Sequence, residues 1–222
     1  LDLISEKIDK EKIMLVVKAN AYGLGSVEIA KILQEVGVNF FGLANLEEVI
    51  ELQEAGIKAN FLILGASFED ELVEATKRGI HTAISSMQQL KFLVKNNLNP
   101  NIHLKFDTGM TRLGFEVDEA KKIIEFCKNN NLNLVGIFSH LSDSDGNTIE
   151  TKNFTLEQIE KFKKLEHMYI DKNINYDDIK GISNIARAGL NEVRPLSIGE
   201  ATRISGVTSN DITLIIAHMN DK

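Results

Sequence analysis

Short apolar runs alternate along the chain with longer segments in which apolar residues recur every three or four positions. Continuous apolar runs of four to six residues are typical of strands buried on both faces of a parallel sheet. We therefore predict eight strands, at residues 14–17, 39–44, 61–64, 80–84, 102–106, 134–140, 179–183 and 192–198.

The segments between these strands carry apolar residues on one side and charges on the other, as amphipathic helices do. Glycines at positions 37, 56 and 79 each follow such a segment and suit the left-handed position after a helix. Ser26 and Ser86 stand where helix N-caps are expected. The predicted helices cover residues 26–36, 46–55, 69–77, 87–95, 117–130 and 154–168.

Regular alternation of strands and helices predicts an α/β fold. Eight strands with helices between them favour a (β/α)8 TIM barrel. An open doubly wound sheet is the alternative, because alternation does not distinguish a closed sheet from an open one. We expect the barrel over residues 1–204 and leave 205–222 unassigned, with a strand at 211–218 that would begin a truncated second domain.

Composition agrees with an ordinary globular protein: 222 residues, 43% hydrophobic and 26% charged. No apolar run approaches the roughly 20 residues that span a bilayer. A net charge of −7 argues against a nucleic acid as the main partner. The single cysteine, Cys127, cannot form an internal disulfide, which indicates a reducing, cytoplasmic compartment. It lies on the apolar stripe of Ala120, Ile123 and Ile124, where a small core residue is expected.

Candidate chemistry lies where the predicted strands end, since barrel enzymes carry their functional groups at that edge. Lys18 ends the first strand, and an amine with reduced hydration there could form a Schiff base. The simpler interpretation is a lysine that reaches solvent at the rim. Gly23 and Gly25, just before a helix, would let backbone N–H groups approach a phosphate.

Further polar residues occupy the ends of later strands: residues 107–112, His140, Asn184 and Arg194. Taken alone, His140 could be a buried core histidine with satisfied hydrogen bonds. Arg194 could form a structural ion pair with Glu192 or Glu200.

Two long strings make the chemistry specific. VVKANAYGLG, residues 16–25, closely resembles the pyridoxal-phosphate lysine motif of bacterial alanine racemases. HLKFDTGMTRLG, residues 103–114, resembles the second signature of the same family. The resemblance extends from the start of the chain to about Ser183. It implies a fold-type III pyridoxal 5'-phosphate barrel that interconverts L- and D-alanine for peptidoglycan supply.

The resemblance also implies roles for single residues. Lys18 would hold the cofactor as an internal aldimine and act as one of two racemisation bases. Tyr22 would hydrogen-bond the cofactor phosphate, and His140 would lie beneath the cofactor ring. No metal is expected.

The second string implies a further set of roles. Lys105, often carbamylated in this family, would orient Arg112. Arg112 would contact the cofactor phenolate, and the backbone of Met110 would lie near the substrate carboxylate.

Later positions match less completely. Asn184 resembles half of a phosphate-binding Asn–Ser pair, with Ile185 at the serine position, and Arg194 resembles the arginine that faces the pyridine nitrogen. An arginine keeps its proton, so it would discourage protonation of that nitrogen and favour racemisation over transamination. Leu196 stands where the family has glycine.

Racemisation needs a base on each face of the substrate carbon. In the family, the second base is a tyrosine from the C-terminal domain of the partner subunit in a homodimer. None of Tyr22, Tyr169 and Tyr176 is placed to replace it, so we expect an incomplete site. The alternatives are a single-domain pyridoxal-phosphate-binding protein without racemase activity and an aldolase-type Schiff-base barrel without a cofactor.

Overall fold

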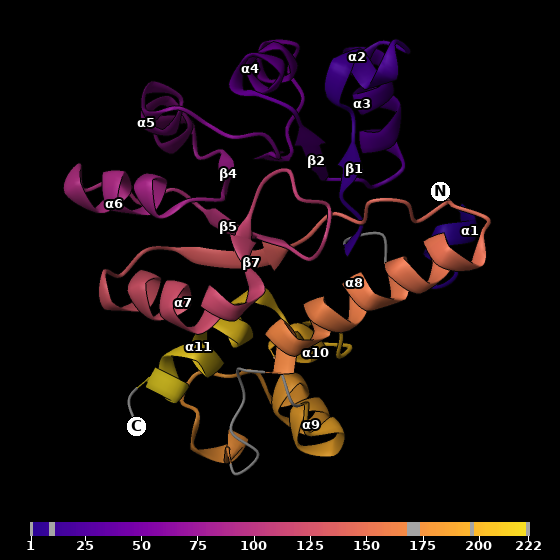
Figure 1. Ribbon diagram of the computed structural model, residues 1–222. Helices are drawn as coiled ribbons and strands as arrows, with labels where there is room; N and C mark the ends of the chain where they lie inside the picture. The colour runs from indigo at the N-terminus through magenta and orange to yellow at the C-terminus, as the bar shows by residue number, and fades with distance from the viewer. Residues whose placement is uncertain (1, 9–11, 168–173, 196–197, 221–222) are drawn as a thin grey trace. The chain divides into compact units, whose positions relative to one another are not determined.

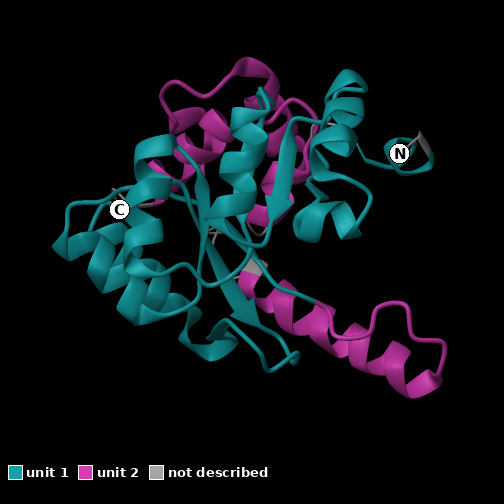
Figure 2. Cartoon of the chain, turned by 90° about the horizontal axis from the view of Figure 1, so that it is seen from above, with its two compact units in different colours: residues 1–140 teal, residues 141–222 magenta. Residues whose placement is uncertain are grey.

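The computed structural model describes residues 2–8, 12–167, 174–195 and 198–220. The chain divides into two compact units, unit 1 over Leu1–His140 and unit 2 over Leu141–Lys222 (Figure 2). Among the described residues, unit 1 holds every strand and unit 2 is built from helices and turns. The division falls after His140, whereas the sequence predicted a boundary after residue 204.

Unit 1 contains a parallel sheet whose main strands follow one another in chain order (Figure 1). Its described strands are β1 (Leu15–Val16), β2 (Phe40–Leu43), β3 (Asn60–Ile63), β4 (His81–Ile84), β5 (Ile102–Asp107) and β7 (Leu134–Phe138). A short strand, β6 (Phe115–Glu116), also pairs with β5. The α/β class is confirmed, with the strand–helix succession of a TIM barrel, and so are the first six predicted strands.

Helices connect these strands, as the 3.6-residue pattern predicted (Figure 1). They are α3 (Ser26–Glu35), α4 (Leu46–Glu54), α5 (Glu69–Arg78), α6 (Met87–Lys95) and α7 (Ala120–Asn129), the last entered through a 3-10 turn, η2 (Val117–Glu119). Two short segments, α1 (Asp2–Ser5) and α2 (Lys18–Tyr22), precede them. The apolar stripe of α7 is buried, including Cys127, and burial raises the pKa of that thiol to about 12, as befits an unreactive core residue.

Helix ends confirm most of the predicted caps. Gly37, Gly56 and Gly79 all have positive φ, where a side chain would be strained. The Ser86 hydroxyl accepts a hydrogen bond from the backbone N–H of Gln89 at 3.3 Å, as an N-cap does. Ser26 is different from the prediction: it is the first residue of α3, and its backbone N–H donates to the side chain of Asn20.

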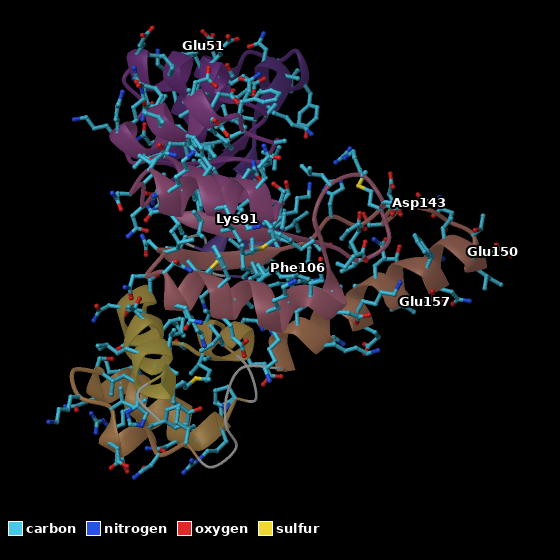
Figure 3. The ribbon with its side chains drawn as sticks, turned by 60° about the vertical axis from the view of Figure 1, so that its left-hand side comes forward. Glu51, Lys91, Phe106, Asp143, Glu150 and Glu157 are labelled. Carbon is cyan, nitrogen blue, oxygen red and sulfur yellow. The ribbon has the colours of Figure 1, made fainter. Side chains whose placement is uncertain are left out.

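The two faces of the sheet have different surroundings. Phe41, Leu43, Phe61 and Ile63 are buried together with apolar residues of α3 and α4, and each such side chain contributes about 1.5–3 kcal/mol. Figure 3 shows Phe106 within the sheet layer, while Glu51 and Lys91 lie on helices α4 and α6. Because α3 and α4 pack on this face of the sheet, the intervening residues of each strand point to the opposite face.

We call that other face the inner face. Strand register places Val16, Gly42, Leu62 and His81 side by side on it. Farther along the sheet, His103 pairs with Gly136, and Lys105 pairs with Phe138. Because side chains alternate along a strand, His103, Lys105 and Asp107 of β5 share this face in order toward its carboxyl end.

Unit 2 is helical where the sequence predicted strands. Its elements are α8 (Ile149–His167), η3 (Tyr176–Asp178), α9 (Asn184–Val193), α10 (Ile198–Thr202) and α11 (Ser209–Asn220). The strand predicted at 179–183 is a non-helical approach to α9, and residues 192–193 of the next end that helix; 196–197 lie outside the described residues. Residues 211–218 are helical as well.

The reason for these three corrections is the spacing of apolar residues. Ala186 and Leu190 of α9 are buried four positions apart, as are Asp211 and Ile215 of α11, and this is the spacing of one helix stripe. Ser183 caps α9 by accepting a hydrogen bond from the backbone N–H of Ala186 at 3.1 Å. No helix within the described ranges is both long and apolar enough to cross a membrane.

Candidate functional site at the carboxyl end of the sheet

The turn that follows β1 winds in the left-handed sense. Four successive residues after Lys18 have φ between 50° and 57°: Ala19, Asn20, Ala21 and Tyr22. For residues other than glycine this backbone costs about 1–2 kcal/mol each. Backbone hydrogen bonds close the turn: Ala21 N–H donates to the Val17 carbonyl at 2.9 Å, and Gly25 N–H donates to the Asn20 carbonyl at 3.0 Å. The half-buried Lys18 therefore leaves the sheet on a tightly determined backbone.

Two side chains hold this turn against its strain. The Glu48 carboxylate accepts from the backbone N–H of Ala19 at 2.7 Å and from that of Ala44 at 2.8 Å. The Asn20 side chain accepts from Ser26 N at 2.8 Å. Glu48 thus ties the turn after β1 to the end of β2, and nothing in the sequence pattern indicated this role.

A second loop is organised by one carboxylate at the end of β5. Asp107 accepts hydrogen bonds from the backbone N–H groups of Gly109 at 2.8 Å, Thr111 at 3.0 Å and Arg112 at 3.1 Å. Burial alone would raise the pKa of Asp107, but these backbone N–H groups outweigh it and lower the pKa. Asp107 is ionised at neutral pH and fixes the loop that carries Arg112.

Replacing Asp107 by alanine is expected to release this loop. Hydrogen bonds to a charged group contribute about 1.5–3 kcal/mol each, and part of that loss reaches the position of Arg112. We expect about tenfold weaker binding of the pyridoxal phosphate that the sequence resemblance implies, measured by absorbance titration. Asp118→Ala, an acidic residue of η2, is the matched control; equal affinity in the Asp107 variant and the wild type would contradict the loop's role.

Three cations and an imidazole gather at this edge of unit 1. Lys105 is buried, with its Nζ 5.6 Å from the centroid of the Phe138 ring. Burial lowers its pKa, and the nearby charge of Arg112 lowers it further, as does that of Lys18, against an opposing effect of Asp107. Such an amine loses its proton more readily than an ordinary lysine.

The imidazole of His140 is subject to the same positive charges. Partial loss of hydration lowers the pKa of His140, and the charges of Arg112, Lys105 and Lys18 add to the effect. His140 is therefore neutral at physiological pH. Because the charges of Lys18, Lys105 and Arg112 all act on His140, these four groups lie near one another.

A small hollow opens beside this cluster, and its lining comes from the ends of β5 and β7. The hydroxyls of Thr108 and Ser139 lie 2.8 Å apart and join the two strand ends. The hollow is lined by Lys105, Phe106, Asp107, Met110, Arg112, Leu113, Ser139 and His140. Concentrated positive charge beside a lysine amine fits an anionic aldehyde such as a phosphorylated cofactor.

Four further candidate site residues are Tyr22, Met110, Asn184 and Arg194. Tyr22 is exposed on the left-handed turn, and Met110 lines the hollow. Asn184 and Arg194 belong to unit 2, so their cofactor roles stay predictions. Within the described part of the chain, no group of three or more His, Cys, Asp or Glu side chains is arranged to hold a metal ion.

Comparison with known proteins shows one extended similarity. A family model described as "Alanine racemase, N-terminal domain" matches residues 1–193. An alanine racemase of Fusobacterium nucleatum is 71% identical over 196 residues, which are 88% of this chain and 55% of that protein. The crystal structure of alanine racemase from Oenococcus oeni superposes with a TM-score of 0.66 at 30% identity, over 74% of this chain and 48% of the other. The chain spans about half the length of these relatives.

A second similarity is short and of another kind. The Fusobacterium nucleatum tRNA uridine 5-carboxymethylaminomethyl modification enzyme MnmG 1 is 89% identical over 66 residues. That segment makes up 30% of this chain but only 10% of the enzyme. It therefore relates one part of the chain to one part of that protein.

Proposed function

The chain belongs to the alanine racemase N-terminal domain family, and from this membership we propose that unit 1 binds pyridoxal 5'-phosphate for the racemisation of alanine. The observation that supports the proposal most directly is the cluster of Lys18, Lys105, Arg112 and His140 at the carboxyl end of the parallel sheet. When bound through a lysine, this cofactor withdraws electrons from the substrate carbon and so weakens its C–H bond.

Each residue of the cluster has a task that its surroundings favour. The Lys18 amine would hold the cofactor and exchange a proton on one face of the substrate carbon. Arg112 would contact the phenolate oxygen of the cofactor, held in place by the loop around Asp107. His140, kept neutral by partial loss of hydration and by its cationic neighbours, would pack against the ring without adding charge.

Lys105 would orient Arg112. Its lowered pKa makes a neutral amine accessible, and a neutral amine can add to carbon dioxide with loss of one proton to give a carbamate anion. That anion would pair with the guanidinium of Arg112. Tyr22 would contact the cofactor phosphate, and the backbone of Met110 would lie near the substrate carboxylate. Homodimer formation and a cytoplasmic location stay predictions from the family resemblance.

The proposal is tested by titrating the purified chain with pyridoxal phosphate. We expect a visible absorbance band that saturates at one cofactor per chain and that borohydride fixes to a peptide containing Lys18. Pyridoxal without the phosphate is the matched control and should bind at least about tenfold more weakly, because the phosphate carries the charge. Absence of the band at saturating cofactor would overturn the proposal.

A coupled D-alanine assay on the loaded chain separates racemisation from cofactor binding alone. None of the chain's tyrosines matches the second base of the family, so we expect little or no production of D-alanine by this chain alone. Robust racemisation would show that another residue supplies that base.

A further inference from the structure

Two similarities overlap on this chain. The Fusobacterium racemase matches 88% of the chain, and the racemase family model ends at residue 193, which leaves residues 194–222 outside that model. The segment shared with the tRNA-modifying enzyme makes up 30%. Both long racemase strings, residues 16–25 and 103–114, lie in unit 1, whereas unit 2 is long enough to hold all 66 residues of the shared segment.

Unit 2 has a hydrophobic core of its own. Its buried residues come from η3, α9, α10, α11 and the segments between them, with no strand among them. Tyr176 is the largest of these and is fully buried. The core consists of Ile174, Tyr176, Ile179, Ile182, Ala186, Leu190, Ala201, Ile204 and Ile215. A barrel needs further strands after β7, and the described part of unit 2 supplies this helical core in their place.

A buried carboxylate joins two helices of this core. Asp211, at 2% exposure, accepts from the backbone N–H of Ser183 at 2.8 Å and of Thr208 at 2.9 Å. The Thr208 hydroxyl donates to it at 2.6 Å. These contacts tie the start of α9 to the start of α11, so unit 2 is fixed by polar contacts within itself as well as by its core.

Arg194 is engaged in the same unit. It ends α9 with φ of 49°, and its Nη1 donates to the Ile174 carbonyl at 2.9 Å. Its guanidinium lies 5.7 Å from the centroid of the Tyr176 ring, within the range of a cation–π contact. Asn184 is the exposed first residue of α9, directly after the Ser183 cap. Both residues therefore have structural surroundings that need no cofactor.

We propose that the segment shared with the tRNA-modifying enzyme lies in unit 2 and forms a separate helical module joined to a racemase barrel unit. Arg194 serves the fold of this module and not the cofactor site. This inference goes beyond the proposed function and does not depend on it.

The test uses the full chain carrying Arg194→Ala, followed by hydrogen exchange of the backbone amides. We expect at least about tenfold faster exchange across residues 174–195 and 198–220, since two contacts of the core are lost. Exchange in the strands of unit 1 should be unchanged. Arg194→Lys, which keeps the charge but not the planar group, should give an intermediate effect.

A second readout separates this inference from the cofactor proposal. Arg194→Ala should leave the affinity for pyridoxal phosphate within about twofold of the wild type, whereas Arg112→Ala should weaken it at least about tenfold and leave exchange in unit 2 unchanged. Weakened cofactor binding in Arg194→Ala, or faster amide exchange throughout both units, would overturn the proposal of a separate module. The exchange measurement stands even if the wild type binds no cofactor.

Discussion

Lys18→Ala is expected to lose the visible cofactor band completely. The band depends on a covalent bond from the cofactor aldehyde to a lysine amine, and alanine offers no amine. Lys105 cannot take over, because its side chain is buried against the Phe138 ring on the neighbouring strand. The measurement is the absorbance titration, followed by borohydride reduction and peptide mapping. Any residual noncovalent affinity would come from the charge of Arg112.

The matched control for this variant is Lys91→Ala. Lys91 is an exposed lysine on α6 (Figure 3). It should bind the cofactor with wild-type affinity and spectrum. A full-strength band in Lys18→Ala, with label on another lysine, would show that the assignment from the first string is wrong.

Acid should destabilise unit 1 through a pair of histidines on its inner face. His81 Nδ1 and His103 Nε2 lie 2.9 Å apart, and the Phe40 ring packs against both. Burial, together with the charge of His81, lowers the pKa of His103 to about 4. Burial lowers the pKa of His81 as well. The folded state therefore holds both rings neutral, and a proton on either would be poorly accommodated.

The sign of the effect follows from proton uptake. An unfolded histidine titrates near pH 6.5, so between pH 6.5 and 4 the unfolded chain binds a proton that the folded His103 does not. The free energy of unfolding falls as pH falls through this window, by up to about 3 kcal/mol. Above pH 7 the contribution of this pair is constant.

Urea unfolding of the wild type and of His103→Gln at pH 7 and pH 4.5 measures this contribution. Glutamine does not titrate, so the variant should lose less stability on acidification than the wild type. The carboxylates of the chain still take up protons in both proteins. His218→Gln, which removes a histidine from unit 2, is the control and should leave the acid response of unit 1 unchanged. Equal acid sensitivity in His103→Gln and the wild type would contradict the assignment.

The sequence predicted unit 1 well because its strands repeat one physical situation. Runs such as residues 14–17 and 61–64 are apolar throughout, since both faces of a parallel strand are covered. Intervening helices show their stripe clearly, as in Ile123, Ile124 and Cys127 of α7. The site residues Lys18 and His140 were found because each breaks an apolar run at a strand end.

Unit 2 could not be predicted in the same way. Residues 179–183 and 211–218 are short apolar stretches, and length alone does not separate a buried strand from one stripe of a short helix. The barrel expectation then favoured strands where Ser183 and Asp211 in fact organise helix starts. Glu48 was missed for another reason: its partner is a backbone turn whose left-handed form leaves no periodic signal.

That left-handed turn limits how far the lysine string can be moved to another protein. The ten residues of the string specify a backbone that is unfavourable by itself, and Glu48, outside the string, accepts a hydrogen bond from Ala19 of the string and another from Ala44 after β2. A graft of residues 16–25 onto a different barrel would relax to a right-handed turn and point its lysine elsewhere. The transferable unit is the string together with the helix that follows the next strand, so a reliable search for such sites would require an acidic residue at the start of that helix.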